Sequence, residues 1–284
     1  ARMRLREEEM QQTQSVPEQR FELGDSRFAL IEEINRGSMG IVYKAQDRIL
    51  DEVVALKVLN TALTSDPASV ERFKQEARAA RRLSHPNIIR IHDFFEAGEK
   101  KFLSMEYLDG EDLKKILLRK KRFAEEETRM LMIEVLRALD YAHRLGVIHR
   151  DIKPANIMLS VKQEVKVADF GIAKILTNDD ATKTCAMIVG TPLYMSPEQI
   201  EGGRGIDARS DIYSLGISCY ELLSGKPPFR DGNIEYHHIH TQAPDLPAEI
   251  SGAMQHFVMK CIEKPQDKRF QTSRDALNYL NSLD

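Results

Sequence analysis

The sequence predicts an α+β fold of two lobes, a small antiparallel-sheet lobe with one helix and a larger helical lobe. Between residues 28 and 59, apolar residues alternate with polar ones and turn breakers intervene, which is typical of antiparallel strands. Beyond residue 108 the apolar residues recur at helical spacing instead. We therefore expect a polar extension at 1–27, the small lobe at 28–107 and the large lobe at 108–284.

The composition fits one globular unit with a large core. The chain has 284 residues and a formal net charge of −3, which argues against a dedicated nucleic-acid binder. Its cysteines lie far apart without metal-ligand spacing, so we expect reduced thiols, with Cys219 and Cys261 in the core. No apolar run approaches the ~18 residues of a membrane span. Because residue 1 is Ala, we expect a cytoplasmic domain of a larger protein, anchored to a membrane by another segment if at all.

The first 27 residues are polar and charged, with too few apolar positions for a heptad pattern. Two interpretations fit them, a solvated or frayed helix and a dimerisation helix, and the composition favours the first.

The small lobe has signals for five strands and one helix. Three antiparallel strands fit residues 28–59. A helix over 67–83 has Asp66 as its N-cap and Pro67 at its first position. Further strands are expected at 87–95 and 101–107.

A short crossover at 107–110 leads into the large lobe, and we expect the cleft beside it. The segment at 208–224 is strongly apolar, as expected for a helix in the middle of a helical lobe. His237, His238 and His240 show no ligand spacing with cysteines or carboxylates, so we interpret them as an exposed polar turn. The expected helices cover 112–119, 125–145, 208–224, 249–263 and 273–283.

Two motifs in fixed order carry the chemistry. Residues 149–156 read His-Arg-Asp-Ile-Lys-Pro-Ala-Asn, and residues 169–171 read Asp-Phe-Gly. Phosphoryl transfer needs an acidic base, a cation and metal ligands, because the protein's task is positioning and charge neutralisation. A surface turn would explain one such tripeptide but not both segments in order. We expect the base at Asp151, the cation at Lys153 and the metal ligands at Asn156 and Asp169.

Three more segments complete the pattern. Val54-Ala55-Leu56-Lys57 is an apolar run broken by a single Lys, typical of a buried strand with one functional cation. Glu76 lies at the edge of the apolar face of the 67–83 helix, and Ser196-Pro197-Glu198 closes the segment that Asp169 begins. At this point the chain resembles the catalytic domain of the eukaryotic-like (Hanks-type) Ser/Thr protein kinases over about residues 28–284. Its sequence at 81–88 and 194–199 is most similar to the bacterial members of this family.

The resemblance implies transfer of the γ-phosphoryl group of ATP to protein Ser/Thr hydroxyls, with Mg²⁺, or Mn²⁺ in its place. Lys153 and Pro154 after Asp151 are similar to Ser/Thr rather than Tyr kinases. Lys57 is then expected to pair with Glu76 and face the phosphates, and Glu198 is expected to pair with Arg269.

The resemblance also places the nucleotide. Residues 34–42 stand where the family has its Gly-rich loop, but the first glycine is Asn35, a residue that tolerates unusual backbone angles. Asp112 matches the position that meets the ribose, and Met105 the position before the crossover that limits the adenine pocket. The expected nucleotide contacts are Asn35, Gly37, Gly40, Val42, Ala55, Lys57, Met105, Glu106, Leu108, Asp112 and Met158.

The segment between Asp169 and Glu198 is expected to act as a switch. A loop of this length without structure of its own is usually functional. A phosphate on this segment could bind cations from three elements. The alternative interpretation is that these are three solvated surface cations. Met187 fills the family's commonest acceptor offset, which leaves the site open between two threonines. The regulatory residues expected are Thr182 and Thr184 as acceptors and Arg72, Arg150 and Lys174 as their cations.

Two other functions are alternatives to this one. A pseudokinase would bind ATP as a scaffold without turnover, and its usual sign is loss of one of Lys57, Glu76, Asp151, Asn156 or Asp169; none is lost. A small-molecule phosphotransferase of similar fold would lack the full segment through Glu198. We therefore expect protein substrates and ATP as partners, no nucleic acid, and a homodimer through the N-terminal extension or the small lobe as a further option.

Overall fold

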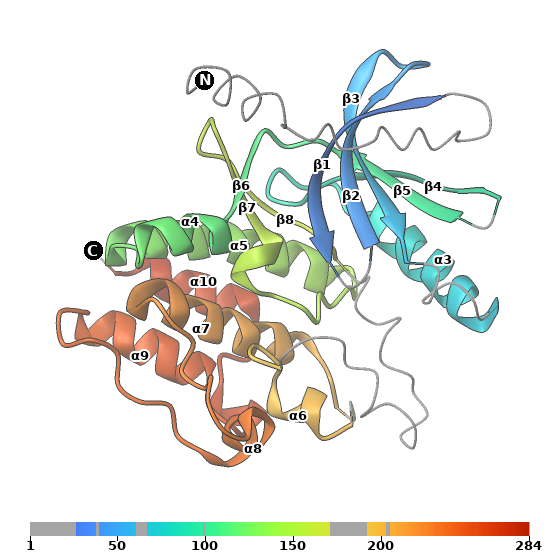
Figure 1. Ribbon diagram of the computed structural model, residues 1–284. Helices are drawn as coiled ribbons and strands as arrows, with labels where there is room; N and C mark the ends of the chain where they lie inside the picture. Colours follow the sequence, from blue (N-terminus) through green and yellow to red (C-terminus); the bar gives the residue numbers. More distant parts are fainter. Residues whose placement is uncertain are drawn as a thin grey trace, which may run out of the picture.

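The computed structural model describes residues 27–37, 40–60, 67–98, 100–170, 192–202 and 205–283, and within α3 it leaves the side chains at 67–69, 72 and 76 undescribed. Two lobes lie one above the other, a sheet with one helix above a mostly helical lobe (Figure 1). The α+β architecture expected from the sequence is confirmed. The small lobe comprises β1 (Phe28–Gly37), β2 (Gly40–Asp47), β3 (Glu52–Leu59), α3 (Pro67–Arg81), β4 (Ile91–Ala97) and β5 (Lys100–Glu106).

The small-lobe sheet is antiparallel, with strand order β1-β2-β3-β5-β4. Strand β3 is buried on both faces because two apolar clusters sandwich it. Val54 and Leu56 pack into a satellite cluster with Phe28 and Phe102, whereas Ala55 belongs to the main core on the opposite face. Since side chains alternate along a strand, Lys57 shares the face of Ala55, which places its ammonium on the cleft side.

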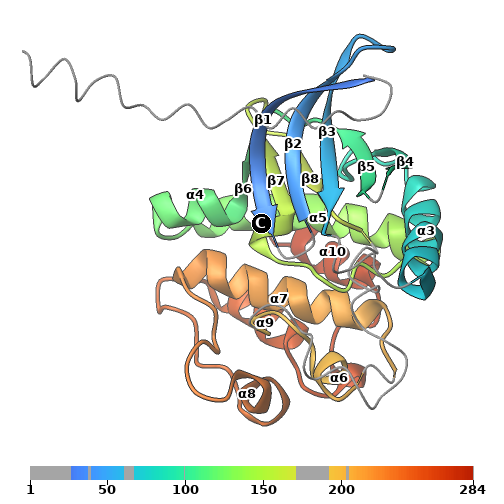
Figure 2. The same ribbon diagram turned by 45° about the vertical axis from the view of Figure 1, so that its right-hand side comes forward.

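The large lobe is built around α5 and α7, and Figure 2 shows α7 crossing the middle of the lobe between α5 and α9. All side chains of α7 from Ser210 to Leu223 are buried. A Cβ on Gly216 would lie 2.5 Å from the Cβ of Cys261, so α7 and α9 approach closely there. The elements are β6 (Gly110–Asp112), α4 (Leu113–Lys120), α5 (Glu125–Arg144), β7 (Ile157–Ser160), β8 (Val165–Val167), α6 (Pro197–Ile200), α7 (Ala208–Ser224), α8 (Ile234–His240), α9 (Gly252–Cys261) and α10 (Ser273–Asn281).

Two sequence predictions on the fold are wrong. The segment from His237 to His240 is not an exposed turn but the end of α8, and His238 is fully buried there. The strand expected from residue 87 begins only at Ile91, because residues 87–89 pair with the large lobe instead: Ile89 N donates to Val167 O at 2.9 Å. The expected burial of Cys219 and Cys261 is confirmed.

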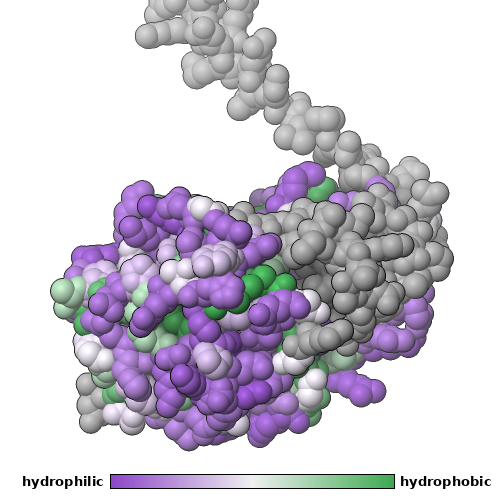
Figure 3. All heavy atoms as spheres, turned by 90° about the horizontal axis from the view of Figure 1, so that it is seen from below, coloured by the Kyte–Doolittle hydropathy of each residue, from purple (hydrophilic) through white to green (hydrophobic). Residues whose placement is uncertain are grey.

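The surface of the described part is mainly polar. Seen from below, the large lobe is mostly hydrophilic, with apolar residues gathered in small groups between polar ones (Figure 3). Among the described residues, no helix combines the length and the apolar character that crossing a membrane requires.

Candidate active site

The loop that carries Asp151 is fixed from below by one buried carboxylate. Asp211, at the start of α7, accepts from the backbone N–H of His149 at 2.8 Å and of Arg150 at 2.7 Å. His143 of α5 donates to the same carboxylate at 2.7 Å. Burial raises the pKa of Asp211, but the hydrogen bond from His143 and the neighbouring histidine charges outweigh it, so that pKa lies below its usual range. The loop therefore rests on a carboxylate that stays ionised.

The His149 ring links this loop to the metal-binding segment. Its Nε2 donates to the carbonyl of Ala168 at 2.8 Å, and its ring meets the edge of Phe170 with centroids 4.6 Å apart. Its Nδ1 accepts from the backbone N–H of Asp151 at 3.2 Å. One buried imidazole thus sets the spacing between the base and the residue before Asp169.

The Asp151 carboxylate is held by one oxygen. Its Oδ2 accepts from Lys153 Nζ at 2.7 Å and from Asn156 Nδ2 at 3.0 Å, and the same amide nitrogen reaches the Asp151 carbonyl at 2.8 Å. Among the described residues, no hydrogen bond is formed to Oδ1, and the side chain is 28% exposed. The free oxygen is available to a hydroxyl group that enters the cleft.

Lys57 of the small lobe and Asp169 of the large lobe meet across the cleft. Lys57 Nζ lies 2.7 Å from Asp169 Oδ1, and the lysine side chain is 5% exposed. Burial raises the pKa of Asp169, but the charge of Lys57 and its hydrogen bond lower it by more. The pKa of Asp169 therefore lies below its usual range. Asp169 adopts a φ of 62°, a left-handed conformation that is uncommon for residues other than glycine. Such conformations cluster at functional sites.

The β1–β2 hairpin contains two glycines, and its backbone requires glycine at only one of these two positions. Gly40 has a φ of 146°, and a Cβ there would lie 2.0 Å from the carbonyl oxygen of Val58. Gly37 has no atom within 4 Å of a built Cβ, so space remains in front of it. Asn35 pairs with Val42 in the β1–β2 ladder and is exposed. It is not among the described non-glycine residues that have a positive φ. The β1–β2 ladder therefore needs no unusual backbone angle at Asn35.

The expected adenine pocket lies where β3, β5 and the crossover meet. Ala55 pairs with Met105 in the β3–β5 ladder, and both are nearly buried. The Asp112 carboxylate caps α4 by accepting from Lys115 N at 2.9 Å, so one of its oxygens is already engaged. Glu106 uses its side chain for Lys166 at 2.8 Å, and its backbone N–H donates to the carbonyl of Arg90 at 2.8 Å. The roles of these residues, and those of Val42, Leu108 and Met158, stay predictions.

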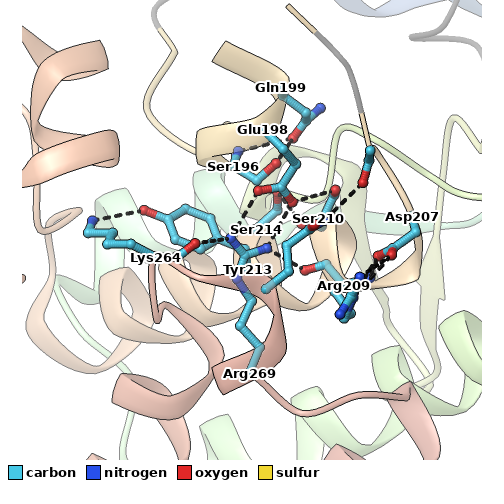
Figure 4. Close-up of polar contacts among 12 residues, drawn as sticks. Ser196, Glu198, Gln199, Asp207, Arg209, Ser210, Tyr213, Ser214, Lys264 and Arg269 are labelled. Carbon is cyan, nitrogen blue, oxygen red and sulfur yellow. Dashed lines mark hydrogen bonds and ion pairs between the residues drawn. The ribbon is translucent and has the colours of Figure 1, made fainter. Parts of the chain in front are cut away.

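Below the cleft, Glu198 and Arg269 form the expected buried ion pair (Figure 4). Arg269 donates to both Glu198 oxygens, at 2.8 and 2.9 Å, and to the carbonyls of Glu263, Arg209 and Lys264. Every guanidinium N–H therefore has a partner, which is the condition for a buried charge. Burial raises the pKa of Glu198, but Arg269 lowers it to a net value below the usual range.

Several expected residues lie outside the part of the chain that the structure describes. The activation-segment threonines Thr182 and Thr184 and the cation Lys174 fall within 171–191, and the side chains of Glu76 and Arg72 are also undescribed. Arg150 is described: it has a φ of 68°, and its carbonyl accepts from Gln199 Nε2 at 2.8 Å.

A second polar cluster, centred on Glu221, has no signal in the sequence. The hydroxyl of Tyr194 donates to Glu221 Oε2 at 2.5 Å, and Lys114 Nζ reaches Glu221 Oε1 at 2.5 Å. Glu221 is almost fully buried. Nothing near position 221 marks its partners, because they come from α4 and from the segment before Ser196.

A family model described as the protein kinase domain matches residues 28–279. The chain belongs to this family. A probable serine/threonine-protein kinase of Streptomyces coelicolor is 40% identical to it over 258 residues, which are 87% of this chain and 38% of that protein. Serine/threonine-protein kinase pkn3 of Myxococcus xanthus is 42% identical over 252 residues, which are 83% of this chain and 46% of pkn3. The bacterial Hanks-type resemblance expected from the motifs is thus confirmed.

A solved structure supports the same membership. The PknI kinase domain of Mycobacterium tuberculosis superposes with a TM-score of 0.74 at 28% identity, covering 90% of this chain and 95% of that domain. Membership implies a serine/threonine-type kinase domain that uses ATP with a divalent metal ion. The chain spans less than half the length of the two curated relatives named above.

Proposed function

We propose that this kinase domain transfers the γ-phosphoryl group of Mg²⁺-ATP to Ser and Thr hydroxyls of protein substrates. The observation that carries the proposal is the Asp151 carboxylate, which Lys153 and Asn156 fix through one oxygen, while no described residue bonds to the other. A base so placed can accept the proton of a hydroxyl as it attacks.

Each further side chain has a role in positioning or neutralising charge. Lys153 bridges to Asp151 and can shift toward the transferring phosphate, where its charge opposes the developing negative charge. Lys57 supplies a second cation from the small lobe. Asp211 and His149 hold the loop that carries the base at a fixed distance from the metal-binding segment.

The donor set fits a hard divalent ion. Asn156 offers an amide oxygen and Asp169 an ionised carboxylate, and oxygen ligands of this kind suit Mg²⁺ and also Mn²⁺. When bound, such an ion neutralises charge on the phosphates. Its place in this chain belongs to Asn156 and Asp169, and we propose Mg²⁺ as the working ion.

Radiolabelled ATP incubated with a protein substrate tests the function. We expect label to be transferred by the wild type and to be lost in Asp151→Asn, while ATP affinity stays within about a few-fold, because the ATP contacts lie elsewhere. Wild-type turnover by the variant would remove Asp151 from the mechanism. Absence of transfer by both proteins, with ATP still bound, would favour the pseudokinase.

For the whole protein we propose a cytoplasmic location, where ATP is available, and protein substrates as partners. A homodimer through the small lobe is supported by one surface feature. Ile49, Leu50 and Val53 are 72%, 59% and 40% exposed at the β2–β3 turn, an apolar tip that a second subunit could cover.

A further inference from the structure

Lys44 of β2 lies on the cleft face of the small-lobe sheet. It pairs with Ala55 in the β2–β3 ladder and stands two residues after Val42. Because alternate residues of a strand share a face, Lys44 faces the same way as Val42, which packs against the main core. Ala45, the next residue, belongs to the satellite cluster on the opposite face. A charged side chain therefore stands beside two of the expected adenine contacts.

The ammonium group of Lys44 lies over an aromatic ring of the crossover. Its Nζ is 4.8 Å from the centroid of the Tyr107 ring, within the roughly 6 Å at which an aromatic face attracts a cation. Glu32 of β1, its partner in the β1–β2 ladder, places a carboxylate oxygen 3.6 Å from the same nitrogen. Tyr107, first, and Glu32 raise the pKa of Lys44 above its usual value. The lysine therefore stays charged between these two partners.

A solvated surface lysine is the plain alternative, because exposed ion pairs contribute little to stability. Lys44 differs from such a lysine in two respects. Only 28% of its side chain is exposed. Its ammonium group also contacts two other segments, β1 and the crossover, rather than a neighbour on its own strand. Contacts of this kind constrain how the segments lie against one another.

The crossover is held from both lobes at consecutive residues. Glu106, at the end of β5, pairs with Lys166 of β8 in the large lobe at 2.8 Å. Tyr107 follows it and meets Lys44 from the small lobe. Since lobes of this kind move about a few residues of the segment that joins them, a contact from the crossover to β2 restrains the position of that strand.

The strand register separates Lys44 from the phosphate end of the site. Val42 pairs with Lys57, whose ammonium group reaches Asp169 in the large lobe. Lys44 pairs instead with Ala55, two residues away from that cation and closer to the residues of β3 that pair with the end of β5. Its charge is therefore distinct from the one expected at the phosphates and stands at the adenine end of the site.

We propose that Lys44 is a positioning residue for the nucleotide, because its contact with Tyr107 holds β2 against the crossover over the adenine pocket and so slows nucleotide release. Lys44 acts through β2, which carries Val42, and touches no reacting atom. Its role in binding rests on the proposed kinase function, whereas the contact itself does not. The contact is the same before and during phosphoryl transfer, so its loss should weaken binding without slowing the chemical step.

Hydrogen–deuterium exchange without nucleotide tests the contact. Lys44→Met keeps the length of the side chain but removes its charge, and we expect it to raise amide exchange in residues 106–110 by about threefold, because the crossover loses one attachment. Lys44→Arg keeps a cation for the ring and should stay near the wild-type rate. Lys101→Met is the matched control, the same change at a lysine of this sheet that pairs with Glu96, and should leave this exchange unchanged.

Titration with ADP tests the role in binding. We expect Lys44→Met and Tyr107→Leu each to raise the Kd for ADP by about threefold through faster release. The double variant should be no worse than either single one, because both remove the same contact. Tyr107→Phe keeps the ring and should retain most of the affinity. In turnover, Lys44→Met should raise the KM for ATP and leave kcat unchanged.

Unchanged exchange of residues 106–110 in both Lys44→Met and Tyr107→Leu would overturn the contact. Additive losses of ADP affinity, or a lower kcat at unchanged KM, would overturn the positioning role. If the wild type binds ADP and Lys44→Met binds it equally well, this inference fails while the proposed function stands. A wild type that binds no ADP would overturn the proposed function and this role together.

Discussion

At the residue scale, His238 shows how burial fixes a charge state. Its ring is fully buried in α8, Nδ1 meets the Tyr213 hydroxyl at 2.9 Å, and Nε2 has no hydrogen-bond partner among the described residues. Burial lowers the pKa of His238 to about 4, with the Lys264 charge as a second cause. The ring is therefore neutral in the fold at pH values where the unfolded chain begins to bind a proton.

This difference predicts a pH dependence of stability. The folded pKa lies below the ordinary value near 6.5, so the unfolded state binds the proton first and stability is lost as pH falls from about 6.5 to 4. The free energy of unfolding should fall about 1.4 kcal/mol per pH unit more steeply in wild type than in His238→Phe. Urea denaturation at several pH values measures the difference in slope. Parallel curves for the two proteins would show that His238 is not the buried neutral base.

At the element scale, the β1–β2 hairpin depends on one glycine more than on the other. Gly40→Ala should destabilise the fold by about 1–3 kcal/mol, because the new Cβ meets the Val58 carbonyl and the φ of 146° is unfavourable for alanine. Gly37→Ala is the matched control and should change stability little, since nothing lies within 4 Å. Thermal denaturation of the two variants decides. Equal melting temperatures would mean that the hairpin yields to the added Cβ at Gly40.

The junction between α6, α7 and the segment before α10 rests on the Glu198–Arg269 pair. Arg269→Met should cost about 3–5 kcal/mol in the free energy of unfolding, because Glu198 is left buried without its partner. The double variant Arg269→Met/Glu198→Leu should recover a large part of that loss, since no stranded charge remains. Chemical denaturation of the three proteins gives the cycle. A single variant as stable as wild type would mean that water replaces the arginine.

Elements were predictable where the signals are local. The helix expected at 208–224 has those bounds, because Asp207 caps its start and Gly225, with a φ of 84°, ends it. The end of α8 was missed because a histidine-rich segment looks polar, whereas His238 packs against Tyr213 and Phe229, which come from elsewhere in the chain. The Tyr194–Glu221–Lys114 cluster was missed for the same reason, since its members are far apart in sequence.

At the scale of the whole molecule, the site exists only where the lobes meet. Lys57 comes from β3 and Asp169 from the large lobe, so their 2.7 Å contact depends on how the two lobes are positioned against each other. Asn87 links the segment before β4 to the large lobe, because its Nδ2 donates to Val165 O at 2.9 Å. The motif spacing predicted which residues would gather at the cleft, whereas the distances between lobes follow from contacts such as Asn87–Val165 that no local pattern encodes.

Regulation at this scale is predicted to act through a phosphate. Purified kinase domain incubated with Mg²⁺-ATP should gain phosphate on Thr182 or Thr184, and its rate should rise as it does. A phosphate of about −2 charge can bind cations from separate elements, here Arg72 on α3, Arg150 beside the base and Lys174 after the Asp-Phe-Gly motif. Mass spectrometry before and after the incubation, read beside activity, measures both effects.

Substitutions separate a phosphate switch from incidental labelling. Thr182→Ala/Thr184→Ala should keep ATP binding but stay slow, because no phosphate gathers the three cations. Arg72→Ala should leave the phosphorylated protein equally slow, since α3 then loses its link to the segment. A double alanine variant as fast as the phosphorylated wild type would contradict the switch. Met187, which stands at the family's commonest acceptor offset, would then point to a segment that works without a phosphate.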